Sequence, residues 1–312
     1  MIIARITGGL GNQLFQYAMG RRLAALHKTE LLLDTTGYGL DGEPRPKELR
    51  GFTRPLSLFK FQISAKQANN SEILKLRDDF LTSSPHARVI RQLRKLKPDL
   101  LWKRSHVVER GYEFQPTALM LPDNVYVQGF WQSHKYFADI SSTIRQELEP
   151  VDPSISDLAM KAVRKLKARF GQVVSLHVRR GDLAYAHEIL KKKNITHGAP
   201  VSGQYIKQAM AKFSPDACFL VFSDSPSDVK WCQDNVRAER IEFAAGESDV
   251  FDLVMMRFCD HHIIANSSFS WWAAWLNERP GRRVVAPGAW SAPEARVFIP
   301  IKDLIPEDWT VL

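Results

Sequence analysis

The chain has few cysteines and no arrangement of residues that marks a metal site. Its three cysteines, Cys218, Cys232 and Cys259, lie far apart with no CxxC spacing. Such an odd and sparse set argues against a disulfide scaffold and against a cysteine zinc site. Cys218 and Cys259 stand in apolar stretches, which predicts reduced core residues and a reducing compartment. The pair His261 and His262 lacks a companion ligand at zinc spacing, so we expect a strand-edge pair there.

Long apolar segments are also absent. Residues 1–6 form a short apolar segment that an arginine interrupts, which is too short for a signal peptide or a membrane span. No other stretch reaches about 18 apolar residues. We therefore expect a soluble, cytoplasmic protein. A length of 312 residues is enough to bury a substantial core and favours two domains.

Positive charge is in excess. The formal net charge is +9 and the isoelectric point is about 9.5, which indicates anionic partners such as nucleotides, phospholipid head groups or nucleic acid. Residues 86–97 combine apolar residues at helical spacing with surrounding Arg and Lys. A solvated basic helix is the ordinary interpretation of this stretch. The alternative is peripheral contact with an anionic membrane, at its inner face, which would suit a lipid-linked acceptor.

Strands and helices alternate along most of the chain. Residues 2–7, 14–27 and 30–33 are predicted as strand, helix and strand, with a glycine-rich turn at 8–13. Two prolines make residues 149–153 the best linker candidate. Beyond it we predict helices at 154–170, 204–213, 226–235, 249–258 and 268–277, and strands at 173–178, 218–222, 241–243, 262–265 and 283–286. This pattern predicts an α/β protein with two Rossmann-like domains facing a cleft, at residues 1–150 and 151–312.

Polar or glycine-rich segments follow four of the predicted strands, at residues 8–13, 177–182, 223–226 and 266–272. In a parallel sheet such loops gather along one edge, where ligands bind. The segment 177–182 places a histidine, two arginines and an aspartate at a strand end. Guanidinium groups match phosphate oxygens, and a neighbouring carboxylate orients them. We interpret this segment as a pyrophosphate site rather than a surface ion pair.

The other three segments each have a structural alternative. Residues 8–13 lack the GxGxxG spacing and the lysine of a Walker loop, so they form either a tight turn or a binding loop. Ser223 and Asp224 precede a helix, where they either cap it or let Asp224 contact a base edge or a ribose. Ser268 either caps a helix with core tryptophans or contributes to an anion site at the helix N-terminus.

Taken together, these segments resemble the α-1,2-fucosyltransferase family of bacteria and animals. The matching residues are GGLGNQLFQY at 8–17, QGFWQS at 128–133 with KYF at 135–137, HVRRGD at 177–182, IIANSSFSWW at 263–272 with AWLN at 274–277, and VAP at 285–287 with Trp290. HVRRGD fits the HxRRxD motif, which α-1,6- and protein O-fucosyltransferases share more distantly. The resemblance implies a GT-B fold and an inverting transfer of fucose from GDP-fucose to the 2-hydroxyl of a galactose. It implies no required metal or other cofactor, and an acceptor that is a galactose-terminated oligosaccharide or glycolipid.

The resemblance also implies roles for single residues. Arg179 matches the family's key arginine and stabilises the negative charge that grows on the β-phosphate, and Asp182 buttresses it. His177 and Asp182 are the titratable groups of the motif, and a phosphate oxygen of the leaving group is the third candidate for the general base. His177 also contacts the nucleoside. The remaining implied donor contacts come from Arg180, Ser223, Asp224, Asn266, Ser267, Ser268, the N–H of Phe269, Gly9, Gly11 and Asn12.

Two rival functions stay open at this point. The first is a GDP-fucose transferase of another linkage or acceptor, such as an α-1,6 enzyme. The second is a non-catalytic basic protein that binds nucleic acid or glycans. Nothing in the chain resembles an RNA-binding motif, and the polar residues lie at strand ends instead of on a stacking platform, so we expect no nucleic-acid partner.

Overall fold

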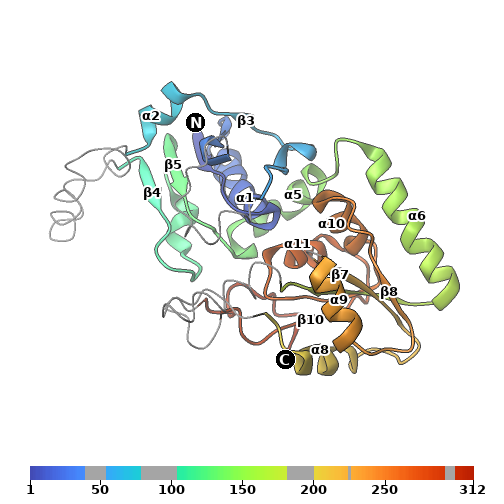
Figure 1. Cartoon of the computed structure of the whole chain (residues 1–312). Coiled ribbons are helices and arrows are strands. Elements are labelled where there is room, and N and C mark those ends of the chain that lie inside the picture. The colour runs from blue at the N-terminus through green and yellow to red at the C-terminus, as the bar shows by residue number, and fades with distance from the viewer. Residues whose placement is uncertain (39–53, 79–103, 181–199, 224–225, 292–298) are drawn as a thin grey trace. The chain divides into compact units, whose positions relative to one another are not determined.

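The computed structural model describes residues 1–38, 54–78, 104–180, 200–223, 226–291 and 299–312. The chain divides into two compact units (Figure 1). The first unit comprises Met1–Gly8, Asn12–Glu43 and Ile63–Ile144, and the second comprises Gly9–Gly11, Pro44–Gln62 and Arg145–Leu312. The last passage from the first unit to the second lies within helix α5 (Ser141–Glu147).

The first unit is built on a five-stranded sheet in the order β3-β2-β1-β5-β4, with every neighbouring pair parallel. Its strands are β1 (Ile2–Arg5), β2 (Leu31–Asp34), β3 (Lys66–Gln67), β4 (His106–Val108) and β5 (Val125–Gln128). Its helices include α1 (Leu10–His27) and α2 (Asn70–Leu76). The three strands β2, β1 and β5 are largely buried, as expected for the centre of a parallel sheet.

The start of α1 differs from the prediction. We expected a turn through residue 13, but the helix begins at Leu10. Gly8 alone among the glycines of this segment has a left-handed backbone, with φ of 77°, so one residue is enough to turn the chain. Strands β3 and β4 and helix α2 were not predicted. The basic stretch 86–97 lies outside the described residues.

The second unit is built on a six-stranded sheet in the order β11-β10-β9-β6-β7-β8, again with all neighbours parallel. Its strands are β6 (Val173–Val178), β7 (Cys218–Ser223), β8 (Ile241–Phe243), β9 (His261–Ile263), β10 (Val284–Ala286) and β11 (Thr310–Val311). Its helices include α6 (Pro153–Phe170), α8 (Gly203–Met210), α9 (Pro226–Asn235), α10 (Asp249–Arg257) and α11 (Ser268–Leu276). Two α/β units on parallel sheets confirm the predicted fold class.

Local sequence explains where α6 begins and ends. The Asp152 carboxylate accepts a hydrogen bond from the Ser154 N–H at 2.9 Å, and Pro153 takes the first helical position. Gly171 follows the helix with φ of 79°, a conformation that glycine adopts without steric cost. Strand β6 can therefore start two residues later, at Val173.

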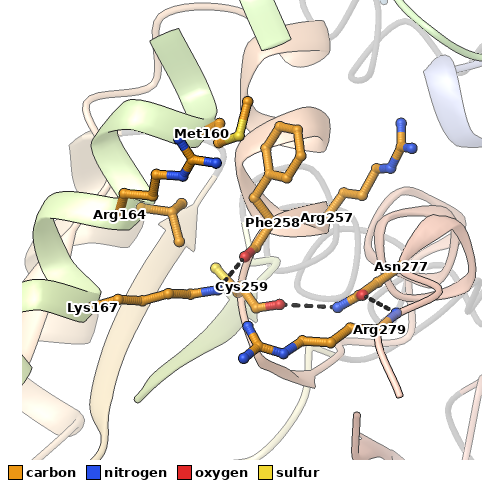
Figure 2. A pocket seen from close by; sticks show the side chains of 9 residues that line it. Met160, Arg164, Lys167, Arg257, Phe258, Cys259, Asn277 and Arg279 are labelled. Atoms are coloured by element: carbon orange, nitrogen blue, oxygen red, sulfur yellow. Dashed lines mark hydrogen bonds between the residues drawn. The ribbon is translucent and has the colours of Figure 1, made fainter. Parts of the chain in front are cut away.

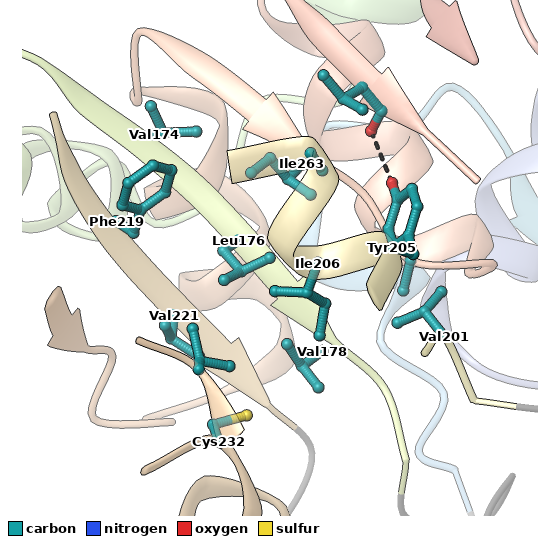
Figure 3. Packing of buried hydrophobic residues seen from close by; sticks show 14 of the residues in the cluster. Val174, Leu176, Val178, Val201, Tyr205, Ile206, Phe219, Val221, Cys232 and Ile263 are labelled. Atoms are coloured by element: carbon teal, nitrogen blue, oxygen red, sulfur yellow. Dashed lines mark hydrogen bonds between the residues drawn. The ribbon is translucent and has the colours of Figure 1, made fainter. Parts of the chain in front are cut away.

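The two faces of β6 have different side chains because successive residues of a strand point to opposite sides. Val174, Leu176 and Val178 pack on the face covered by α8, where Ile206 and Tyr205 meet them (Figure 3). The Tyr205 hydroxyl donates to the carbonyl oxygens of Ile264 (2.7 Å) and Val285 (3.1 Å). Ile264 directly follows β9, and Val285 belongs to β10. Ser175 and His177 therefore face the opposite side of the sheet.

Helix α11 is apolar on all sides and forms part of the core. Every residue from Ser270 to Leu276 is buried. The Trp271 indole N–H donates to the Leu304 carbonyl at 2.8 Å, which satisfies its polar atom. All three cysteines are buried, so the predicted core positions of Cys218 and Cys259 are confirmed. Within the described ranges, no helix has both the length and the hydrophobicity that a bilayer crossing requires.

Candidate functional site

The carboxyl ends of three adjacent strands meet at one edge of the second sheet. Strand β6 ends at Val178, directly before Arg179, and Val178 pairs with Ser223 at the end of β7. Strand β9 pairs with β6 on its other side and leads into residues 266–268. The structure therefore brings Arg179, Ser223 and the segment 266–268 to the same edge, as the strand pattern predicted. Asp182 and Asp224 lie outside the described residues.

The two arginines after β6 have different surroundings. The Arg180 guanidinium carbon lies 4.1 Å from the ring centroid of Trp231 in α9, a cation–π contact that fixes its direction. Arg180 therefore points to the same side of the sheet as Val178. Arg179 is half-buried at the strand tip.

His177 and Asn266 are buried beneath the strand tips. The His177 ring is 2% exposed, and its centroid lies 5.7 Å from that of the Phe269 ring in α11. The Asn266 amide nitrogen donates to the Trp290 carbonyl at 3.2 Å. His177 thus supports the start of α11, and Asn266 ties the end of β9 to the segment that carries Trp290.

Ser267 is the N-cap of α11. Its hydroxyl accepts from the Phe269 N–H at 3.3 Å, and its carbonyl accepts from the Trp271 N–H at 3.1 Å. The sequence left a capping role open for Ser268, and the structure gives that role to Ser267 instead. The cap occupies the Phe269 N–H, one of the groups that we expected to hold phosphate. Ser268 is the first helical residue and is half-buried.

Gly9 and Gly11, which belong to the second unit, differ from each other in how much space a side chain would have. A Cβ atom at Gly11 would lie 2.4 Å from the carbonyl carbon of Ser268 and 2.5 Å from the nitrogen of Phe269. Both are backbone atoms, so only glycine fits in this position. A Cβ at Gly9 would lie 3.7 Å from the Arg54 side chain, an ordinary contact.

A second polar cluster lies in the first unit, where the GGLGNQ and QGFWQS motifs meet. Strands β1 and β5 are neighbours, so the segments that follow them are adjacent. The Gln16 side chain accepts from the Thr7 N–H (2.8 Å) and donates to the Gly129 carbonyl (3.1 Å). The Gln132 amide nitrogen donates to the Asn12 Oδ1 at 2.9 Å. Asn12 was a predicted site residue, whereas Gln16 and Gln132 were not.

Glu109 joins this cluster and was not predicted either. Its carboxylate accepts from the backbone N–H groups of Phe130 (2.6 Å) and Trp131 (3.0 Å). Burial raises the pKa of Glu109 above its usual range, against the opposing effect of these two hydrogen bonds. No local sequence pattern marks this residue, because its partners lie more than twenty residues away along the chain.

The histidine pair 261–262 lies in β9 and belongs to the core. The Asn277 amide nitrogen donates to Nε2 of His262 at 2.8 Å, and Nδ1 of His262 donates to the Ser175 hydroxyl at 2.8 Å. Burial lowers the pKa of His262 to about 3, which keeps the imidazole neutral. The ring of His261 stacks on Phe213, and its Nδ1 accepts from the Arg283 N–H.

A separate pocket lies on the second unit at the amino ends of its strands, near the start of β6 (Figure 2). Asp260 pairs with Lys167 and Arg279, and Glu149 pairs with Arg257, so acidic groups neutralise three of the cations near it. None of the predicted site residues lines this pocket, whose lining is Met160, Val163, Arg164, Lys167, Arg257, Phe258, Cys259, Asn277 and Arg279. We interpret it as part of the packing between α6, α10 and α11.

Comparison with known proteins gives consistent matches over most of the chain. The sequence model of Glycosyl transferase family 11 matches residues 53–310. An alpha-1,2-colitosyltransferase of Escherichia coli is 29% identical over 99% of this chain and 98% of its own length. The O-antigen biosynthesis glycosyltransferase WbnK of Escherichia coli is 26% identical over 92% of this chain and 94% of its length. Galactoside alpha-(1,2)-fucosyltransferase 2 of Bos taurus is 26% identical over 56% of this chain and 51% of its length.

The comparison with solved structures gives more distant matches. The NodZ alpha-1,6-fucosyltransferase co-crystallized with GDP is 14% identical, with a TM-score of 0.44 over 87% of this chain and 90% of that chain. A mutant of Arabidopsis thaliana FUT1 in complex with GDP is 12% identical, with a TM-score of 0.48 over 94% of this chain and 72% of that chain.

Proposed function

Because the chain belongs to Glycosyl transferase family 11, we propose that it moves L-fucose from GDP-β-L-fucose to the 2-hydroxyl of a terminal β-galactoside, with inversion at the anomeric carbon. The α-1,2 linkage is supported by the Escherichia coli and Bos taurus relatives, whose descriptions both state it. The acceptor is a galactose-terminated oligosaccharide or glycolipid.

The observation that carries the proposal is the position of Arg179 directly after the central strand β6, beside the ends of β7 and β9. A guanidinium at the carboxyl edge of a parallel sheet lies where such sheets bind nucleotides. Arg180 is directed away by its stacking on Trp231. Arg179 is therefore our choice for the group that contacts the β-phosphate of the donor.

The reaction is a single displacement. The acceptor 2-hydroxyl oxygen bonds to the anomeric carbon while the bond from that carbon to the phosphate oxygen breaks, and the bonding electrons leave with GDP. Negative charge grows on the β-phosphate, and Arg179 stabilises it. Preorganised charge of this kind lowers a barrier by about 3–4 kcal/mol. Since the Arg179 guanidinium supplies the positive charge in this proposal, we expect no requirement for a metal ion.

The acceptor proton needs a separate recipient. His177 is buried against Phe269, which suits support of the site rather than proton abstraction from a substrate hydroxyl. We therefore assign the proton to Asp182 or to a phosphate oxygen of the leaving group. The candidates that stay for the remaining donor contacts on this unit are Ser223, Asp224, Asn266, Ser267 and Ser268. The Phe269 N–H drops out, because it donates to the Ser267 hydroxyl.

A second donor has one observation in its favour. The Escherichia coli relative that matches nearly the whole chain is described as a colitosyltransferase. A GDP-activated colitose is therefore the alternative donor for the same linkage. Either donor leaves the same GDP and makes the same demand on Arg179.

The test is incubation with GDP-β-L-fucose or GDP-colitose and a panel of β-galactosides, with and without EDTA. Product linkage is then read by NMR. We expect an α-1,2-linked sugar with equal yield in EDTA. An α-1,6 product, an EDTA-sensitive reaction or no transfer from either donor would contradict the proposal in linkage, metal independence or activity, respectively.

A further inference from the structure

The segment that follows β5 contains a strained residue in a buried place. Trp131 has a φ of 54°, a left-handed backbone that a residue with a large side chain rarely adopts. Its side chain is 1% exposed and meets Tyr136 edge to face, with ring centroids 5.4 Å apart. Such strain persists only where the surroundings hold it in place, and it concentrates at functional sites. A neighbouring group must therefore hold the backbone of Trp131 in this conformation.

That group is the carboxylate of Glu109. One oxygen, Oε2, accepts from both the Phe130 N–H at 2.6 Å and the Trp131 N–H at 3.0 Å, and Oε1 lies 3.1 Å from the same Trp131 nitrogen. Two consecutive N–H groups that converge on one anion form a typical anion-binding turn. Here the anion is the protein's own side chain, and it stabilises the turn directly.

The backbone around Glu109 fixes where that carboxylate lies. Strand β4 pairs with β5 through Val108 and Gln128, and the Glu109 N–H continues the ladder by donating to the Gln128 carbonyl at 2.8 Å. A Cβ atom at Gly129 would lie 2.4 Å from the Glu109 Cβ and 2.6 Å from its Oε2. Only glycine lets the carboxylate approach the turn this closely.

The Phe130–Trp131 turn also positions two residues of the polar cluster in which the GGLGNQ and QGFWQS motifs meet. Gly129, before it, accepts from the Gln16 side chain at 3.1 Å. Gln132, after it, donates to Asn12 at 2.9 Å. Gln132 and Asn12 are both half-buried, and Gln132 Oε1 is buried. Trp131 and Gln132 are adjacent in the chain. A change in the backbone at Trp131 would therefore move Gln132 away from Asn12.

From this geometry we propose that Glu109 is a positioning residue for glycosyl transfer: it holds the Phe130–Trp131 turn and thereby sets Gln132 against Asn12. It acts through the backbone N–H groups and Gln132, and the side chain of this cluster that meets the reactants is Asn12. The inference rests on the proposed function for its activity measurement.

The experiment is a kinetic double-mutant cycle. We expect Glu109→Ala and Gln132→Ala each to lower kcat/KM by about 10- to 100-fold, since small displacements in a site have effects of this size. The kcat/KM of the double variant should be no lower than that of the less active single variant, because both changes remove the same contact. Glu109→Gln should recover most activity, because one amide oxygen can accept both N–H groups as Oε2 does. The control Asp139→Ala, which removes an exposed partner of Arg22 in the same unit, should leave activity unchanged.

Additive losses in the cycle, or a Glu109→Ala variant as active as the control, would overturn the proposal. A crystal structure of Glu109→Ala gives an independent measurement. We expect Trp131 to leave the left-handed region and the Gln132–Asn12 hydrogen bond to be lost, whereas an unchanged turn would overturn the proposal. If the unaltered protein transfers no sugar, the proposed function fails, and this structural measurement still decides the role of Glu109.

Discussion

The guanidinium of Arg180 stacks on the indole of Trp231, with its central carbon 4.1 Å from the ring centroid. The contact separates two neighbouring arginines, of which the family resemblance singles out Arg179 for the β-phosphate. It links the end of β6 to helix α9, which covers one face of the sheet. Arg180 is therefore part of the packing between β6 and α9, and Arg179 stays our proposal for the phosphate contact.

The first prediction concerns this pair. We expect Arg180→Ala and Trp231→Ala to share a coupling of about 0.5–1 kcal/mol in the free energy of unfolding, which is the usual size of a partly exposed cation–π contact. Urea denaturation of the single and double variants measures it. A coupling of zero would show that the stacking contributes nothing to stability.

The second prediction concerns Arg179. Arg179→Ala should lower kcat/KM by about 100- to 1000-fold, the range seen when one preorganised charge stabiliser is removed. Arg179→Lys should recover part of this loss only, because an ammonium lacks the fork that grips two phosphate oxygens. The variant should stay folded, which circular dichroism checks. A nearly unaltered rate for Arg179→Ala would remove this residue from the mechanism.

The third prediction tests the close contact of Gly129 with Glu109. Gly129→Ala places a Cβ 2.4 Å from the Glu109 Cβ, and such overpacking costs about 1–3 kcal/mol in the free energy of unfolding. The matched control is Gly203→Ala, because nothing lies within 4 Å of a Cβ added at Gly203. Chemical denaturation of both variants measures the difference. Equal stabilities would mean that the turn adjusts without cost.

The fourth prediction concerns the pH dependence of stability. Burial lowers the pKa of His262 to about 3 in the folded protein, from 6.5 in the unfolded chain. Since the unfolded chain binds the proton first, the stabilisation is complete above pH 6.5 and is lost progressively as the pH falls toward 3. Arg282 and His261 act in the same direction as burial, and Asp260 opposes it.

Urea unfolding at several pH values tests this on the protein and on His262→Gln, which cannot take up the proton. The free energy of unfolding of the variant should fall less steeply across this pH range. The reason is that unfolding of the variant takes up to one proton fewer than unfolding of the protein. An NMR titration of His262 adds a direct measurement. A midpoint near 6.5 in the folded protein would contradict the burial argument.

Much of the second unit was predictable from the sequence. Strand β6 and helix α9 have the predicted bounds, because apolar strands and capped helices alternate there without interruption. The shared edge that holds Arg179 and Ser223 follows from the same alternation, since parallel strands end at one side of a sheet.

The first unit was harder to predict for physical reasons. Strand β3 is only Lys66–Gln67 and is exposed, and β4 begins with a histidine, so neither has a recognisable hydrophobic period. The role of Glu109 depends on the pairing of β4 with β5, which no local pattern reveals. The early start of α1 was missed because glycines are read as turn residues, although Gly11 fits within the first helical turn.

The most direct test of the account is a crystal structure of the protein with GDP. The account predicts that the Arg179 guanidinium lies within hydrogen-bond distance of a β-phosphate oxygen, with Arg180 still stacked on Trp231. A diphosphate bound away from the end of β6, without contact to Arg179, would contradict it.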